Sequence, residues 1–254
     1  MPRNNYNHKH SLHDEVEEPL TSSSSFTSDT ITILGFGSLL SKTSAQMTFP
    51  NLQNFRLGKI QNYKIIAVSK TFPIEQILPL IDYGQKDFGE NKVQEAIDKW
   101  SGIKNNYENI KLHLIGKLQT NKVKIAVKIF EYIHSVDSFK LAKKISEEQI
   151  KQKKDIKIFI QVNVGNEPQK SGIDLKELKN LYSYCKEINL KVVGLMCIPP
   201  INQKPLEYFK QMNVLQNELK LFELSMGMSA DYLEAVEQNS SYLRIGSNIF
   251  GKRS

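Results

Sequence analysis

From residue 62 onward, the apolar residues of this chain follow two alternating patterns. Short runs rich in β-branched and aromatic residues predict strands, and the segments between them, with apolar residues three or four apart, predict helices. The expected strands are 64–70, 86–90, 111–116, 132–136, 156–164, 191–197, 223–228 and 242–246. Eight strand–helix repeats predict a parallel sheet closed into a single (β/α)8 barrel of the TIM type, an α/β fold. An open doubly wound sheet is the alternative, but no G-x-G-x-x-G motif follows the first strand, which disfavours a dinucleotide-binding version.

The first part of the chain lacks this alternation. Residues 1–30 are polar and low in complexity, so we expect a disordered tail, and the histidines at 8, 10 and 13 belong to it rather than to a metal site. Residues 31–61 form an N-terminal segment to which the sequence assigns no clear role. The predicted barrel therefore spans residues 62–254.

The net charge changes this picture only slightly. The formal charge of the 254-residue chain is +7, and residues 1–61 hold five basic and five acidic side chains, so the whole excess lies in the barrel. A basic domain can indicate a nucleic-acid partner. Here, however, the lysines alternate with acids along helical segments such as 140–155, and the chain lacks clusters that combine aromatic and basic residues. We expect no nucleic-acid partner, although the positive field would favour a small anion.

Cysteine use and hydropathy indicate the compartment. The two cysteines, Cys185 and Cys197, show neither CxxC spacing nor a paired framework, which is typical of a reducing cytoplasm. We find no apolar run long enough to span a membrane and no signal peptide. We therefore expect a cytoplasmic protein without a membrane partner.

Lys70 is the first candidate for chemistry. It follows the first predicted strand in "IIAVSKTFP", and the active face of a (β/α)8 barrel is built from the C-terminal ends of its strands. A lysine is costly to desolvate and forms Schiff bases with carbonyl compounds. A lysine that only extends its stem along the strand end, or an aldolase-type lysine, would give the same pattern.

The loops after the seventh and eighth strands suggest the other half of a site. Barrels commonly bind phosphate there, on backbone N–H groups at a helix N-terminus. Ser229 is expected to act as a helix N-cap and hydroxyl donor, and Gly246 and Ser247 to offer open backbone and a second hydroxyl. For each serine alone, simple capping is the alternative. A Schiff-base lysine facing a phosphate cradle implies a phosphorylated aldehyde, for which pyridoxal 5′-phosphate (PLP) is the obvious candidate.

Several stretches resemble the PLP homeostasis proteins of the YggS/PROSC type, single-domain relatives of the alanine racemase barrel. They include "AVSKTFP", "FGENKVQEA", "LHLIGKLQTNK", "IQVNVGNEPQKSGID", "LSMGMSADYLEAV" and "LRIGSNIFGKR". The resemblance implies a barrel like the alanine racemase N-terminal domain, PLP fold type III, with the cofactor bonded to Lys70. It also implies that Ser229, Gly246 and Ser247 bind the phosphate.

The same resemblance implies roles for two further residues. Asn91 corresponds to a pocket asparagine near the cofactor ring. Arg244 corresponds to an arginine under the cofactor, placed against either the pyridine nitrogen or the phosphate. His113 and Met196 are candidates for the cavity wall, but a place in the core is the expected one for both.

The function implied by the resemblance is a monomeric protein that carries PLP as a Schiff base and acts in vitamin B6 homeostasis without turnover, with PLP-dependent apoenzymes as partners. An amino-acid racemase is the alternative. Two-base racemisation needs a second acid/base group, which in alanine racemases comes from a neighbouring subunit with an additional β domain. The chain ends at Ser254, soon after the last strand, which disfavours this reading.

The sequence also departs from the family pattern. Family members usually carry a helix before the first strand, and we find no good candidate for it here. Ser247 stands where threonine is common, and Lys92 where tyrosine is common. Asn239 replaces a frequent glycine, and asparagine can still adopt the left-handed conformation of such a turn.

Overall fold

The computed structural model describes residues 63–104, 106–107 and 109–251. The predicted tail, the segment 31–61 and the expected position of a covering helix lie outside the described residues.

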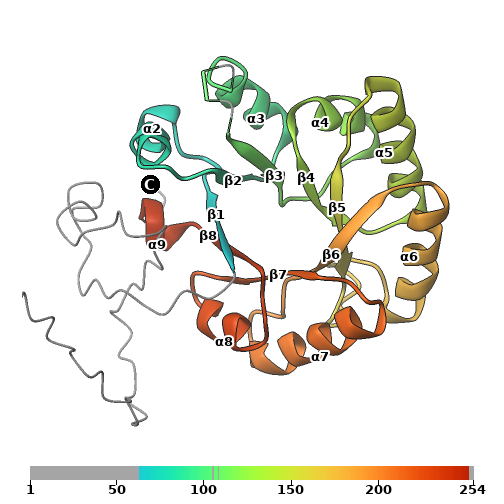
Figure 1. Ribbon diagram of the computed structural model, residues 1–254. Coiled ribbons are helices and arrows are strands. Elements are labelled where there is room, and N and C mark those ends of the chain that lie inside the picture. The colour runs from blue at the N-terminus through green and yellow to red at the C-terminus, as the bar shows by residue number, and fades with distance from the viewer. Residues whose placement is uncertain (1–62, 105, 108, 252–254) are drawn as a thin grey trace, which may run out of the picture.

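Eight parallel strands form a closed barrel in sequence order (Figure 1). The strands are β1 Lys64–Val68, β2 Asp87–Glu90, β3 Lys111–Leu114, β4 Tyr132–Val136, β5 Lys157–Val162, β6 Lys191–Cys197, β7 Glu223–Met228 and β8 Tyr242–Ile245. Pairing of β1 with β8, from Lys64 opposite Tyr242 to Ala67 opposite Ile245, closes the sheet. The predicted (β/α)8 barrel is confirmed, and the open sheet is excluded.

The helices lie around the outside of the barrel (Figure 1). They are α2 Ile74–Asp82, α3 Val93–Trp100, α4 Val123–Ile129, α5 Phe139–Gln152, α6 Leu178–Glu187, α7 Pro205–Glu218, α8 Tyr232–Glu237 and α9 Ser247–Phe250, with 3₁₀ turns η2 Thr120–Lys122 and η3 Leu175–Glu177.

Local sequence explains why these elements begin and end where they do. Helix α5 starts after Ser138, whose hydroxyl accepts a hydrogen bond from the Leu141 amide, as an N-cap residue does. It ends at Lys153, which has a left-handed backbone. Asn239, after α8, has a φ of 61° and so adopts the left-handed conformation that asparagine tolerates.

Two layers of side chains form the core. The larger layer lies between the barrel and its helices, and the smaller one fills the barrel with Ile66, Tyr132, Phe159, Met196 and Tyr242. His113 is fully buried and stacks on the Tyr132 ring, with the ring centroids 4.3 Å apart. His113 and Met196 therefore belong to the core, as expected.

The N-terminal end of the barrel is closed by two tyrosines. The Tyr132 and Tyr242 rings are almost completely buried. Lys157 Nζ donates to the Tyr132 hydroxyl and Lys64 Nζ to the Tyr242 hydroxyl, each over 3.1 Å. Both ammonium groups also lie 5.0 Å from the centroid of the ring concerned, within the range of cation–π attraction. This plug leaves the opposite end of the barrel for a ligand.

In the part of the chain that the structure describes, no helix has both the length and the hydropathy to cross a bilayer. The same residues contain no group of three or more His, Cys, Asp or Glu arranged to hold a metal ion.

Candidate functional site

A cavity of about 550 Å³ lies at the C-terminal ends of the strands, which is a typical size for a small-molecule site. It is lined by Val68, Lys70, Phe72, Asn91, Ile115, Ile198, Met228, Ser229, Ala230, Arg244, Gly246, Ser247 and Gly251. All six residues that the sequence analysis singled out are in this set. The structure brings them together, and their roles toward a cofactor stay predictions.

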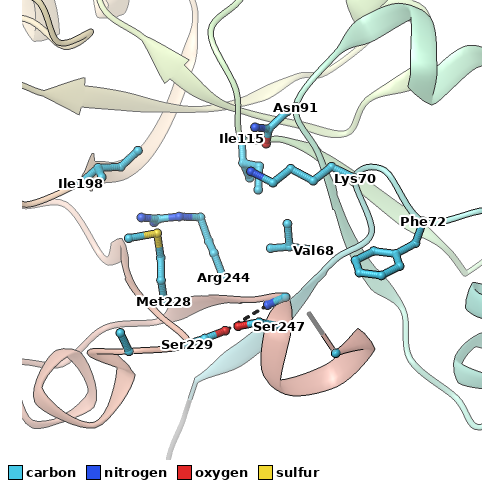
Figure 2. A pocket seen from close by; sticks show the side chains of 13 residues that line it. Val68, Lys70, Phe72, Asn91, Ile115, Ile198, Met228, Ser229, Arg244 and Ser247 are labelled. Atoms are coloured by element: carbon cyan, nitrogen blue, oxygen red, sulfur yellow. Dashed lines mark hydrogen bonds between the residues drawn. The ribbon is translucent and has the colours of Figure 1, made fainter. Parts of the chain in front are cut away.

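Lys70 and Asn91 occupy one side of the cavity. Lys70 stands in the turn after β1, and its side chain extends into the cavity with the amine toward the centre (Figure 2). Asn91 directly follows β2, which pairs with β1, so the parallel register brings the two residues to the same edge of the barrel. Val68 and Ile115 add apolar surface beside them. This side offers a reactive amine next to a neutral hydrogen-bonding group.

Ser229 and Ser247 occupy the other side (Figure 2), and Gly246, which directly precedes Ser247, lines the same cavity. The Ser229 hydroxyl accepts a hydrogen bond from the Gly246 amide over 3.4 Å, which joins the loop after β7 to the loop after β8. The predicted role of Ser229 as a helix N-cap is wrong. The N-cap residue of α8 is Asp231, whose carboxylate accepts from the Met228 amide over 2.6 Å.

The backbone at Gly246 is open toward the cavity. A Cβ added there would meet Val68 atoms at 3.4 and 3.5 Å, which are ordinary contacts, so the packing of the protein itself does not require glycine. Ser247 begins α9, and the first N–H groups of a helix have no partner within the helix. This side of the cavity therefore suits a ligand with acceptor oxygens, such as a phosphate.

Arg244 brings a buried positive charge to the cavity. Its side chain reaches the lining from β8, yet the residue is only 4% exposed, which excludes a surface ion pair. Nη1 donates to the Ser225 hydroxyl over 2.8 Å, and Nη2 donates to the Cys197 carbonyl over 2.9 Å. Both partners are neutral, and no ion pair of Arg244 occurs among the described residues. Burial lowers the pKa of Arg244, but a guanidinium stays protonated in proteins.

A chain of buried hydrogen bonds leads from Arg244 through the barrel. Ser225 Oγ lies 2.9 Å from His134 Nδ1, His134 Nε2 lies 2.9 Å from His113 Nδ1, and His113 Nε2 lies 2.9 Å from an Asp87 carboxylate oxygen. Because arginine has only donors, Ser225 accepts from it and directs its own hydrogen to His134. Each imidazole then accepts through Nδ1 and donates through Nε2. The chain runs in one direction, from a guanidinium to a carboxylate, with both histidines neutral.

The pKa shifts of the two histidines agree with this assignment. Burial lowers the pKa of His113, although Asp87 and, more weakly, Glu131 oppose the shift. Burial also lowers the pKa of His134 to well below the usual value, and repulsion from His113, were it protonated, and from Arg244 lowers it further. Both rings therefore resist protonation in the folded protein.

This pair predicts a loss of stability in mild acid. Below the unfolded pKa of about 6.5, each unfolded imidazole gains a proton that the folded one excludes, so each costs up to about 1.4 kcal/mol of unfolding free energy per pH unit until its folded pKa is reached. Urea unfolding at several pH values between 7.5 and 5.0 measures this slope. His134→Phe is expected to reduce the slope, whatever it does to stability at neutral pH, and an unchanged slope would contradict the prediction.

The sequence analysis missed several residues of the site. The apolar lining, including Phe72 and Ile198, gave no signal because such residues are common in every barrel. Ser225 and His134 were detectable in principle, since each is a polar residue inside a strand that is otherwise apolar. What that pattern does not show is that the two side chains meet.

Comparisons with known proteins agree with this architecture. The family model of the alanine racemase N-terminal domain matches residues 50–254. The PLP homeostasis protein of Aquifex aeolicus is 39% identical over 209 residues, which cover 78% of this chain and 91% of the relative. The protein of the same name from Escherichia coli is 36% identical over 199 residues, which cover 74% and 85%.

Comparison with solved structures finds the same barrel fold. PipY from Synechococcus elongatus, without PLP, superposes with a TM-score of 0.72 at 35% identity and covers 75% of this chain and 93% of its own. PipY with PLP bound superposes with a TM-score of 0.69 at 34% identity, with coverages of 76% and 94%. An alanine racemase from Clostridium difficile has a TM-score of 0.61 at 15% identity, covers 77% and 53%, and shows the shared barrel alone.

Proposed function

The chain belongs to the family of PLP homeostasis proteins, whose barrel is that of the alanine racemase N-terminal domain, and from this premise we propose that it binds PLP in the cavity that Lys70 faces. The observation that carries the proposal is the position of a lysine amine on one side of a single cavity of about 550 Å³ and of Ser229, Gly246 and Ser247 on the other. PipY, of similar sequence and fold, has a structure with PLP bound.

The residues of the cavity fit the two ends of this cofactor. Lys70 would hold the cofactor through a Schiff base with its aldehyde, whose oxygen would leave as water. Ser229 and Ser247 would offer hydroxyls to the phosphate, and Ser247, at the start of α9, would also offer its backbone N–H. Gly246, whose own amide donates to Ser229, would let the phosphate approach the backbone closely. Asn91 would contact the ring, and the Arg244 cation would serve either the pyridine nitrogen or the phosphate. PLP supplies the aldehyde and, when bound, the electron sink of its ring.

We propose a carrier in vitamin B6 homeostasis rather than an enzyme with turnover. Among the described residues that line the cavity there is no His, Tyr, Cys, Asp or Glu, so none of them offers a second acid/base group opposite Lys70. An amino-acid racemase needs such a group, and this absence supports the carrier over the racemase. We further propose that the barrel of residues 62–254 acts as a monomer and delivers PLP to apoenzymes that depend on it.

The proposed compartment is the cytoplasm, in line with the state of the cysteines. Cys185 and Cys197 are both unpaired and buried. Burial raises the pKa of each thiol to about 12, so neither forms the reactive thiolate.

The proposal is tested by adding PLP to the purified protein. We expect a visible absorption band that borohydride bleaches, with the reduced label located on Lys70 by peptide mass spectrometry. Pyridoxal, which lacks the phosphate, should bind at least about tenfold more weakly, because charge-assisted hydrogen bonds contribute about 1.5–3 kcal/mol. A protein that takes up no PLP, or that carries the label scattered over surface lysines, would refute the proposal.

The same preparation separates the carrier from the racemase. The loaded protein is incubated with L-alanine and a panel of other L-amino acids, and the D-isomers are measured by chiral chromatography. We expect no D-isomer above the level produced by free PLP. Sustained turnover with any one amino acid would favour the racemase.

A further inference from the structure

The turn that carries Lys70 has an unfavourable backbone. The Phe72 amide donates to the Ser69 carbonyl over 3.2 Å and closes a four-residue turn in which Lys70 is the second residue and Thr71 the third. Thr71 has a φ of 68°. The third position of such a turn with positive φ is normally glycine or asparagine, and a β-branched residue there is an outlier. This conformation persists only when the surroundings hold it.

Helix α3 holds the turn at both peptide groups that flank Lys70. On one side, Lys99 Nζ donates to the Ser69 carbonyl over 2.8 Å. On the other, the Thr71 amide donates to Glu95 Oε1 over 2.5 Å. Glu95 and Lys99 lie one turn apart on α3 and form an ion pair at 3.3 Å. The two side chains thus form hydrogen bonds with the peptide groups immediately before and immediately after Lys70.

A buried carboxylate anchors this pair to the barrel. Glu90, at the end of β2, is fully buried, and its Oε1 accepts from Lys99 Nζ over 2.9 Å. The same oxygen accepts from the Ser69 hydroxyl over 2.8 Å and from the Trp100 indole over 3.0 Å. An ammonium has three hydrogens, and Lys99 has three acceptors here: the Ser69 carbonyl, Glu90 and Glu95. All three hydrogens of Lys99 are therefore used in holding the turn, and Lys99 does not compete with Lys70 for PLP.

We propose that Glu95 and Lys99 are positioning residues that hold the strained turn from Ser69 to Phe72, so that the Lys70 amine points into the cavity. The inference rests on the proposed function, in which Lys70 receives PLP. Without the hydrogen bond from its amide to Glu95, Thr71 relaxes toward negative φ. The peptide groups on both sides of Lys70 then rotate, and the Lys70 amine no longer points into the cavity. Only the fraction of molecules in which Thr71 keeps its positive φ then binds PLP at Lys70.

Three variants test this role. Glu95→Ala removes the acceptor of the Thr71 amide and is expected to raise the apparent Kd for PLP about tenfold, in proportion to the fall in the competent fraction. Adding Thr71→Gly should restore most of the affinity, because glycine adopts positive φ without strain and no longer needs the hydrogen bond to Glu95. Glu147→Ala is the matched control, since Glu147 is a partly exposed glutamate of α5 that pairs with Lys144. It should bind like the wild type.

A second readout needs no PLP. In the protein without ligand, the Thr71 amide should exchange with deuterium faster in Glu95→Ala than in the wild type, as measured by NMR. Equal affinity and equal exchange in Glu95→Ala and the wild type would overturn the proposal, and so would weaker binding that Thr71→Gly fails to rescue. If wild-type Lys70 takes up no PLP, the proposed function fails, and the exchange rates still decide whether Glu95 holds the turn.

Discussion

Lys70→Ala is expected to remove the visible band of the PLP-treated protein completely and to leave no label that survives borohydride and denaturation. The reason is that Lys70 is the only amine among the described residues that line the cavity. The variant should still bind PLP more weakly and reversibly, through the loops after β7 and β8, and equilibrium dialysis against free PLP measures that remainder.

Lys86→Ala is the control for this experiment. Lys86 is exposed and directly precedes β2, at the end of the barrel opposite the cavity. It should retain the band, the label and the wild-type affinity. A full stoichiometric label in Lys70→Ala, located on one other lysine, would contradict the proposed role of Lys70 and would redefine the site.

Gly194→Ala is expected to lower the unfolding free energy by about 3 kcal/mol or more, because a core cannot absorb a methyl group where backbone already stands. Gly194 lies opposite Glu223 in the β6–β7 pairing. A Cβ at Gly194 would lie 2.0 Å from the Glu223 carbonyl oxygen and 2.6 Å from its carbonyl carbon, so the two strands have to move apart. Urea unfolding followed by circular dichroism measures the change.

Gly102→Ala provides the matched control. A Cβ at Gly102 would meet no atom within 4 Å, and its φ is not positive. Its stability should be close to that of the wild type or slightly higher, since alanine restricts the unfolded chain. Because β7 leads to Ser229, Gly194→Ala should also weaken PLP binding. A stable Gly194→Ala protein with wild-type affinity would show that this strand pair tolerates displacement.

The barrel was predictable because its signals are local and repeated. Each strand is a short apolar run, each helix has its own spacing, and eight repeats leave little choice of topology. The membership of the cavity was predictable for a related reason. In a barrel, residues at the C-terminal ends of the strands converge, so Lys70, Asn91 and Ser229 line one cavity although they are far apart in the sequence.

The contacts that hold the site were not predictable in the same way. Glu95 and Lys99 look like an ordinary surface pair at i and i+4, and nothing in the sequence shows that both reach the turn at Lys70. Ser229 and Asp231 are both good N-cap residues, and local preference does not decide between them. Asp231 takes the N-cap position although its side chain makes no capping hydrogen bond to α8, because its carboxylate is turned back to the Met228 amide at the end of β7. Which residue takes such a role depends on how the closed barrel places each loop and helix, not on the local sequence.

The two tyrosines that plug the N-terminal end of the barrel have a consequence for how the cofactor would enter and leave. Among the described residues, Tyr132 and Tyr242 fill the N-terminal end of the barrel, and the cavity lies at the C-terminal ends of the strands. Under the proposed function, PLP would enter and leave at this same end of the barrel, so a receiving enzyme would have to dock against the face by which the vitamin arrived.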